Sequence, residues 1–266
     1  MSKRLRLETR SFGAETGVPE VAELSAWIAG HRGKPLDLTR FRILQSLAPQ
    51  LEHAIDIPCA GGKYLRDRII TSLTGITGGK ATGDIFADTG LLAEDASAVA
   101  GERRGTWCAL PAPHLLLLSD HYYHDADEWA SALAVTYRAI LRAMRDAGVT
   151  GHVLICDRAE DRELAALAGP KVFFFLPAAD REDLSSLMEY QRNIAIGNRK
   201  LDLVFDLADE YTLRKLFIID PDPAAIELSL SRLDPDRVNA AGYCTVDCGN
   251  YWKGLAASAE YERSSK

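Results

Sequence analysis

The chain has 266 residues, of which 47% are hydrophobic and 26% are charged, as in an ordinary soluble globular protein. This length is near the upper size of a single hydrophobic core, so one large domain is expected rather than two. The formal net charge is -7, from 31 Lys and Arg against 38 Asp and Glu, which leaves no broad basic surface for a phosphate backbone. Nucleic acid is therefore not an expected partner.

The sequence also argues against a membrane protein and against a disulfide framework. Its longest apolar run is far shorter than the roughly 20 residues that a membrane helix needs. The amino terminus, MSKRLRLETR, is basic but lacks the apolar segment of a secretory signal, which favours a cytoplasmic location. Five cysteines, an odd number, then favour free thiols.

Three segments are expected along the chain. Residues 1–50 form an amino-terminal helical segment packed on the main domain, residues 51–255 form an α/β domain, and residues 256–266 form a disordered tail. The helical segment is predicted from apolar residues at helical spacing, which are Val21, Leu24, Trp27, Ile28, Leu38, Phe41, Leu44 and Leu47.

From residue 53, short apolar runs alternate with helical stretches. Continuous apolar runs are typical of strands buried on both faces of a parallel sheet. The expected strands span residues 53–59, 83–88, 114–120, 152–157, 171–177, 215–220 and 241–246. Helices are expected over residues 127–147 and 222–233, and residues 181–211 are expected to form one long helix or two consecutive helices broken near Gly197 and Asn198. Residues 90–113 are expected to form a long connection that covers the site.

This alternation predicts an α/β fold with an open, mostly parallel sheet and helices on both faces, which is Rossmann-like. A closed (β/α) barrel is the alternative. It would need an eighth strand, for which only residues 203–205 are available, and their surroundings favour a helix.

Ligands of open parallel sheets bind at the carboxyl ends of the strands, and polar residues gather there in this sequence. Asp120 and His121 follow one expected strand, and Asp157 follows the next. An imidazole beside a carboxylate can titrate near neutral pH, so these three residues are the candidates for acid–base catalysis.

The stretch Cys59-Ala60-Gly61-Gly62-Lys63 leads from a strand into an expected helix. Bare backbone N–H groups at Gly61 and Gly62, with Lys63 and Arg66 in the first turns, predict an anion-binding loop. It is not a P-loop and not a dinucleotide-binding motif. The same helix end would lower the pKa of Cys59 and make it a candidate nucleophile. A tight turn with an inert Cys59 is the alternative.

Cys244 and Cys248 form a C-x3-C pair that could bind a soft metal such as zinc or iron, or act as a nucleophile or redox pair. His121 and His124 lie three residues apart, so a helical turn would bring both imidazoles to one side, and His124 is a candidate metal ligand. As alternatives, the cysteines are buried small side chains and the histidines lie in a loop next to a helix cap.

Together these features predict an enzyme with transferase or lyase chemistry that acts on a small anionic metabolite. The alternative is a non-catalytic sensor or assembly factor that binds a metal or a metabolite. A homodimer is compatible with either function.

Overall fold

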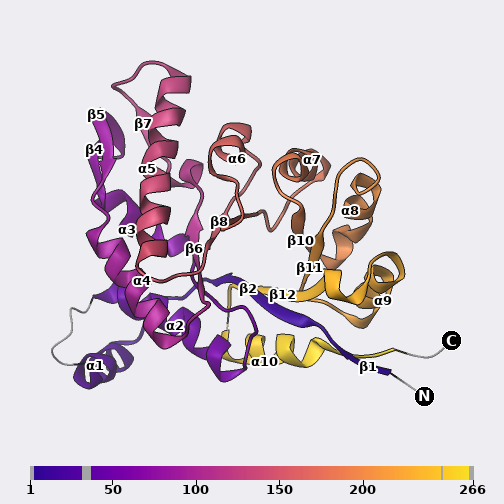
Figure 1. Cartoon of the computed structure of the whole chain (residues 1–266). Coiled ribbons are helices and arrows are strands. Elements are labelled where there is room, and N and C mark those ends of the chain that lie inside the picture. Colours follow the sequence, from indigo (N-terminus) through magenta and orange to yellow (C-terminus); the bar gives the residue numbers. More distant parts are fainter. Residues whose placement is uncertain (1–2, 32–36, 247, 264–266) are drawn as a thin grey trace.

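Eight parallel strands form the centre of the part of the chain that the computed structural model describes, residues 3–31, 37–246 and 248–263 (Figure 1). In chain order they are β2 (Glu8–Ala14), β3 (Cys59–Gly61), β6 (Trp107–Pro111), β8 (His152–Ile155), β9 (Val172–Phe175), β10 (Asn193–Gly197), β11 (Lys215–Ile219) and β12 (Val238–Cys244).

Helices connect these strands and lie outside them, and α5 to α9 follow one another in an arc in Figure 1. The α-helices are α1 (Val21–Gly30), α2 (Leu38–Glu52), α3 (Arg66–Thr71), α4 (Gly90–Glu102), α5 (Ala126–Asp146), α6 (Asp161–Leu167), α7 (Arg181–Tyr190), α8 (Leu201–Leu207), α9 (Pro223–Arg232) and α10 (Cys248–Ser258). Short 3-10 helices are η1 (Lys63–Leu65), η2 (Pro113–Leu116), η3 (Asn198–Lys200) and η4 (Pro235–Arg237). No helix among the described residues combines the length and the apolar character needed to cross a membrane.

Two antiparallel additions complete the fold. A hairpin of β4 (Leu73–Thr77) and β5 (Lys80–Ala87) is joined by the short β7 (Ser119–Asp120) in a separate sheet. Strand β1 (Lys3–Arg6) pairs with β13 (Glu260–Arg263) and so brings the two ends of the chain together.

The eight parallel strands surround one apolar interior. Their backbone ladders form two four-stranded sheets, β10-β11-β12-β2 and β3-β6-β8-β9. One buried cluster takes residues from all eight strands, and its members are Phe12, Cys59, Ala109, Val153, Ile155, Phe173, Phe175, Ala195, Phe217 and Ala241. The predicted class, α/β with mostly parallel strands flanked by helices, is confirmed. Because the inner faces pack on one another and the helices lie outside, the arrangement is that of the barrel alternative, although the two ladders are not joined into one closed sheet.

The amino end of this interior is filled by Arg10, whose guanidinium lies 4.3 Å from the Trp107 ring centroid and 5.0 to 5.1 Å from those of Phe12, Phe173 and Phe217. Burial lowers the pKa of Arg10 to about 10. Aromatic faces attract a cation through their quadrupole, so the four rings partly replace the hydration that Arg10 loses.

The first seam between the two sheets lies between β2 and β3. The backbone there makes two hydrogen bonds, from Ser11 N to the Ile57 carbonyl and from Ile57 N to the Thr9 carbonyl. At Cys59 the fully buried Gln50 side chain takes the place of the neighbouring strand as hydrogen-bond partner. Its Oε1 accepts from Cys59 N at 2.8 Å and its Nε2 donates to the Cys59 carbonyl at 2.8 Å. A helix side chain thus satisfies strand groups that would otherwise be buried without partners.

The second seam, between β9 and β10, is satisfied in the same way. Gln191, the residue that ends α7, accepts from Phe174 N at 2.9 Å through Oε1. Its Nε2 donates to the carbonyls of Phe174 and Asn193, at 2.9 and 3.0 Å. A carboxamide carries one acceptor and two donors, so it can replace a strand neighbour at both backbone groups.

Several predicted elements need correction. Strands β2 and β10 were expected to be helical and are strands, because their inward faces fill the interior. Residues 114–120 are not a barrel strand but η2 and the short β7, and residues 83–88 belong largely to the hairpin strand β5.

Two segments expected to be irregular are ordered. Residues 90–113 contain α4 and the central strand β6. Of the expected tail, residues 256–263 lie in the end of α10 and in β13, which pairs with β1, while residues 264–266 lie outside the described residues.

The seam carboxamides generate a stability prediction. We expect Gln50→Ala to lower the free energy of unfolding by about 3 kcal/mol, because the buried N–H and carbonyl groups of Cys59 both lose a partner. Gln45→Ala on the exposed face of the same helix is the matched control, with a change within about 0.5 kcal/mol. Urea denaturation measures both, and equal effects would contradict the role given to Gln50.

Candidate functional site

A cavity of about 580 Å³ opens at the carboxyl ends of β9 to β12. The loops at this end of parallel strands are where barrel enzymes place their sites. Its floor includes the buried ring of Phe175, and its wall carries charges of both signs. The lining residues are Phe175, Pro177, Gly197, Asn198, Arg199, Lys200, Ile219, Asp220 and Tyr243. We call this space the mouth cavity.

Asp220 is the carboxylate of the mouth cavity. It follows β11 and has a φ of 53°, a left-handed conformation that costs energy for a residue other than glycine. Its backbone is held by Asp220 N donating to the Ala241 carbonyl at 2.9 Å and by Asn198 Nδ2 donating to the Asp220 carbonyl at 2.7 Å. Strained residues that the surroundings hold in place are frequent at functional sites.

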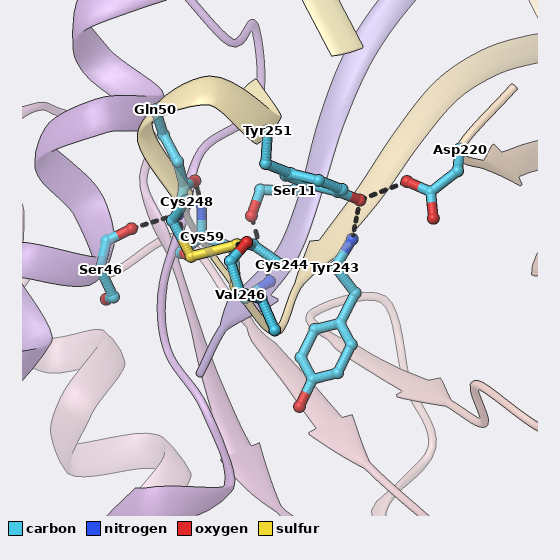
Figure 2. The surroundings of a disulfide bond; sticks show 11 residues. Ser11, Ser46, Gln50, Cys59, Asp220, Tyr243, Cys244, Val246, Cys248 and Tyr251 are labelled. Atoms are coloured by element: carbon cyan, nitrogen blue, oxygen red, sulfur yellow. Dashed lines mark hydrogen bonds between the residues drawn. A yellow bond between two sulfur atoms is a disulfide. The ribbon is translucent and has the colours of Figure 1, made fainter. Parts of the chain in front are cut away.

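Tyr251 of α10 orients this carboxylate, as Figure 2 shows. Its hydroxyl donates to Asp220 Oδ1 and accepts from Tyr243 N at 2.9 Å. Gly242 makes the approach possible, since a Cβ there would lie 2.6 Å from the hydroxyl oxygen. Burial, followed by the hydrogen bond to Asp220, raises the pKa of Tyr251, so the phenol stays protonated.

Glu15 fills the predicted anion-binding loop. Its Oε1 accepts from Lys63 N at 2.8 Å and also from the Tyr243 hydroxyl. Gly62 lies directly against it, because a Cβ at Gly62 would be 3.0 Å from that oxygen. The loop therefore binds a carboxylate, as its sequence suggests, but the carboxylate belongs to the protein. An external anion would have to displace Glu15.

The other members of that loop point elsewhere. Arg66 donates to the carbonyls of Leu115 and Leu116 at the end of η2, at distances from 2.7 to 3.2 Å. Gly61 is the last residue of β3, with a φ of 88° and packed against β6. Both residues stabilise the backbone around the loop.

Cys59 is a fully buried member of the barrel interior. Burial raises its pKa well above the ordinary thiol value, which is opposite to the predicted effect of a helix end. The inert-turn alternative thus describes the position of Cys59 in the structure.

Cys244 and Cys248 form a disulfide with a Cα–Cα distance of 5.7 Å, which corrects the expectation of free thiols at these positions (Figure 2). The end of β12 and the start of α10 lie close enough for this bond. As a disulfide, the pair does not fit a zinc or iron ion, and the described residues contain no group of three or more His, Cys, Asp or Glu side chains arranged so that they could hold a metal ion. A metal there remains an expectation that would require the reduced form and further ligands.

Asp120, His121 and His124 lie together, but in the hairpin layer. The Asp120 carboxylate accepts from the backbone N–H groups of Tyr122, Tyr123 and His124, each at 2.8 or 2.9 Å. Burial raises the pKa of Asp120, but the three hydrogen bonds together outweigh it, so the net shift is downward. Its carboxylate shapes a turn next to β7, and both histidines are exposed.

Asp157 lies instead beside His114, a residue that the sequence patterns did not single out. His114 Nε2 is 2.9 Å from Asp157 Oδ1, and Nδ1 is 2.8 Å from Glu163 Oε2. Burial lowers the pKa of His114, but the hydrogen bond and charge of Glu163 outweigh it, so the net shift is upward. His114 and Glu163 line a smaller cavity of about 290 Å³ between α5 and α6.

The predicted site residues are therefore divided among five places: the hairpin, the His114 cluster, the barrel interior, the loop from β3 into η1 and the β12–α10 turn. The mouth cavity is lined in part by residues that the sequence patterns did not single out, chiefly Asn198 and Arg199. They follow β10, Asn193–Gly197, whose central Ile-Ala-Ile run would have placed them at the carboxyl edge if it had been recognised as a strand.

No protein-family model and no curated protein matches the sequence. Solved structures with a similar fold include a B12-independent methionine synthase from Shewanella sp. W3-18-1 in complex with selenomethionine (TM-score 0.64, 15% identity, 96% of each chain covered). A putative vitamin-B12 independent methionine synthase from Listeria monocytogenes is also similar (TM-score 0.50, 16% identity, 89% of this chain and 91% of that chain). At these identities the likeness shows a shared fold.

The thiol environments predict a defined reactivity. In the native protein we expect no rapid reaction with Ellman's reagent, because Cys59, Cys108 and Cys156 are buried and burial raises the pKa of each. After mild reduction the half-buried Cys248 thiol should react, whereas Cys244 is as buried as the other three cysteines. The Cys244→Ser/Cys248→Ser double variant should show no reactive thiol after reduction, and a reactive thiol in that variant would contradict the buried position of the remaining cysteines.

The His114 cluster predicts a pH-dependent stability. Because the pKa of His114 is raised, its protonated form stabilises the folded state fully below the unfolded value of about 6.5. This contribution is lost as the pH rises through the folded value. The difference in free energy of unfolding between wild type and His114→Gln should be larger at pH 5.5 than at pH 8.5. A difference independent of pH would exclude the imidazolium as the stabilising form.

Proposed function

We propose that this chain is a small-molecule transferase that moves a methyl group to or from the sulfur of an amino acid, with its site in the mouth cavity. The observation that carries the proposal is a cavity of about 580 Å³ at the carboxyl ends of the strands, with Asp220 and Arg199 on its wall and an apolar floor. The fold shared with methionine synthases, one of them solved with selenomethionine, favours this chemistry over other group transfers.

The charges on the wall of the mouth cavity complement those of an amino-acid zwitterion. Arg199 is exposed on the cavity wall and forms no ion pair or side-chain hydrogen bond with the described residues, so it is available for a substrate carboxylate. Asp220 Oδ1 accepts from Tyr251, which leaves Oδ2 available for a substrate ammonium group. Phe175 then offers an apolar surface to the sulfur-bearing side chain.

In the transfer itself, a substrate thiol loses its proton to solvent, since a free thiol of pKa about 8.5 is partly ionised near neutral pH. The thiolate sulfur attacks the methyl carbon while the bond from that carbon to the donor breaks. The protein binds and orients the amino acid for this in-line step. A thiolate-bound zinc or iron would require reduction of Cys244–Cys248, and no step is assigned to it.

The non-catalytic alternative, a metabolite-binding factor, would use the same cavity without turnover. Binding and product formation are therefore measured separately. A factor of this kind would bind the amino acid and form no product.

The test uses L-selenomethionine for binding and L-homocysteine as methyl acceptor. We expect Asp220→Asn and Arg199→Gln each to weaken selenomethionine binding at least tenfold by calorimetry, because each removes one charge from the cavity. Asp206→Asn, an exposed carboxylate on α8, is the matched control and should bind as wild type does.

Product formation is followed by mass spectrometry with sulfonium and N-methyl donors. Methionine formed by wild type and lost in both mouth variants supports the transferase. Binding without product for every donor favours the metabolite-binding factor, and absence of binding would overturn the assignment of the cavity.

A further inference from the structure

A further cavity, of about 530 Å³, lies on the outer surface between the carboxyl half of α5 and the loop that enters β9. Because α5 runs back from the carboxyl end of β6 to the amino end of β8, this groove lies at the opposite end of the strands from the mouth cavity. We call it the basic groove. It is unrelated to the function proposed above.

Four cations line the basic groove: Arg138, Arg142 and Arg145 of α5, and Lys171 of the facing loop. One of them, Arg142, forms an ion pair with Asp146 at 3.6 Å. In the part of the chain described, Arg138, Arg145 and Lys171 have neither an ion pair nor a side-chain hydrogen bond. In a chain of net charge -7, this local excess of about three positive charges is unusual.

The spacing of the arginines makes this excess costly. Arg138, Arg142 and Arg145 lie at positions i, i+4 and i+7 of one helix, so they share a face and repel one another. The helix dipole favours a cation in the last turn, which accounts for Arg145. It does not account for Arg138, which lies two turns earlier. A bound anion would offset the repulsion along the whole stripe.

The floor between these cations is apolar. It is formed by Leu141 of α5, Leu167 of α6, Pro170 and Val172. The volume lies in the usual range for small-molecule cavities, roughly 300 to 1,000 Å³. A ligand that fits both features has an apolar body and an anionic head.

His152 is a buried titratable residue joined to the groove lining through Lys171. It is fully buried at the start of β8, its backbone N donates to the Lys171 carbonyl at 2.8 Å, and neither ring nitrogen has a partner among the described residues. Burial, and then the charge of Arg145, lower its pKa to about 3. His152 is therefore neutral and adds no charge of its own, and the field at this end of the barrel is set by the arginines.

We propose that the basic groove is a second ligand site, for a soluble phosphate monoester with an apolar body. A phosphate monoester carries a charge of about -1.5 to -2 near neutral pH, which suits three uncompensated cations better than a single carboxylate does. Its head would lie on the guanidinium groups of Arg138 and Arg145, and its body on Leu141 and Val172.

The test uses the full chain and octyl phosphate below its critical micelle concentration, with isothermal titration calorimetry as the readout. We expect one saturable site. Inorganic phosphate and octyl glucoside, which carry only the head or only the tail, should each bind at least tenfold more weakly. Equal binding of either compound would overturn the proposal, as would absence of saturable binding or binding only to anionic lipid vesicles.

Variants locate the site. Arg138→Gln/Arg145→Gln should weaken octyl phosphate binding at least tenfold, and Arg138→Lys/Arg145→Lys should restore most of the affinity. Arg181→Gln/Arg232→Gln, which removes two exposed arginines elsewhere and gives the same net charge, should bind as wild type. Loss of octyl phosphate binding in Arg199→Gln, with retention in the groove variant, would place the phosphate in the mouth cavity and overturn this proposal alone.

Discussion

The structure depends on how its two seams satisfy buried backbone groups. Two four-stranded sheets surround one interior, and each seam would leave peptide groups of β3 or β9 without partners. The carboxamides of Gln50 and Gln191 supply those partners from α2 and from the end of α7. Each bond also fixes a helix to a strand, so the carboxyl ends of β3 and β10, where the site residues begin, have defined positions.

The site is then organised around the end of β12. Tyr243 reaches Glu15 with its hydroxyl and Tyr251 with its backbone N–H, and Tyr251 in turn reaches Asp220. The Cys244–Cys248 disulfide joins the strand end to the first residue of α10, the helix that carries Tyr251. Two tyrosine–carboxylate pairs therefore share one strand end, and a displacement of this turn would change the orientation of both carboxylates together.

Sequence patterns predicted the elements that are apolar throughout or strongly amphipathic. Helix α5 and the strands β8, β9 and β11 were found on this ground. Strand β2 was not, because its buried residues include the polar Thr9, Arg10 and Ser11. Strand β6 was not either, because a barrel interior filled by large rings such as Phe12 and Phe175 needs small partners such as Ala109. Short strands with small inward residues carry little hydrophobic signal. The seams could not be predicted either, since no local pattern marks a glutamine whose amide replaces a strand.

The polar residues at the strand ends show why a site is harder to predict than a fold. Asp180 and Asp222 accept hydrogen bonds from backbone N–H groups as the N-caps of α7 and α9, an interaction that stabilises the start of any helix. Asp220, two residues from one of these caps, is the carboxylate on the cavity wall. The sequence cannot separate these roles, because the same residue type meets both needs. The partners separate them. A cap is satisfied by its own helix, whereas Asp220 is held in a strained conformation by groups from three other elements, and its Oδ2 has no hydrogen-bond partner among the described residues.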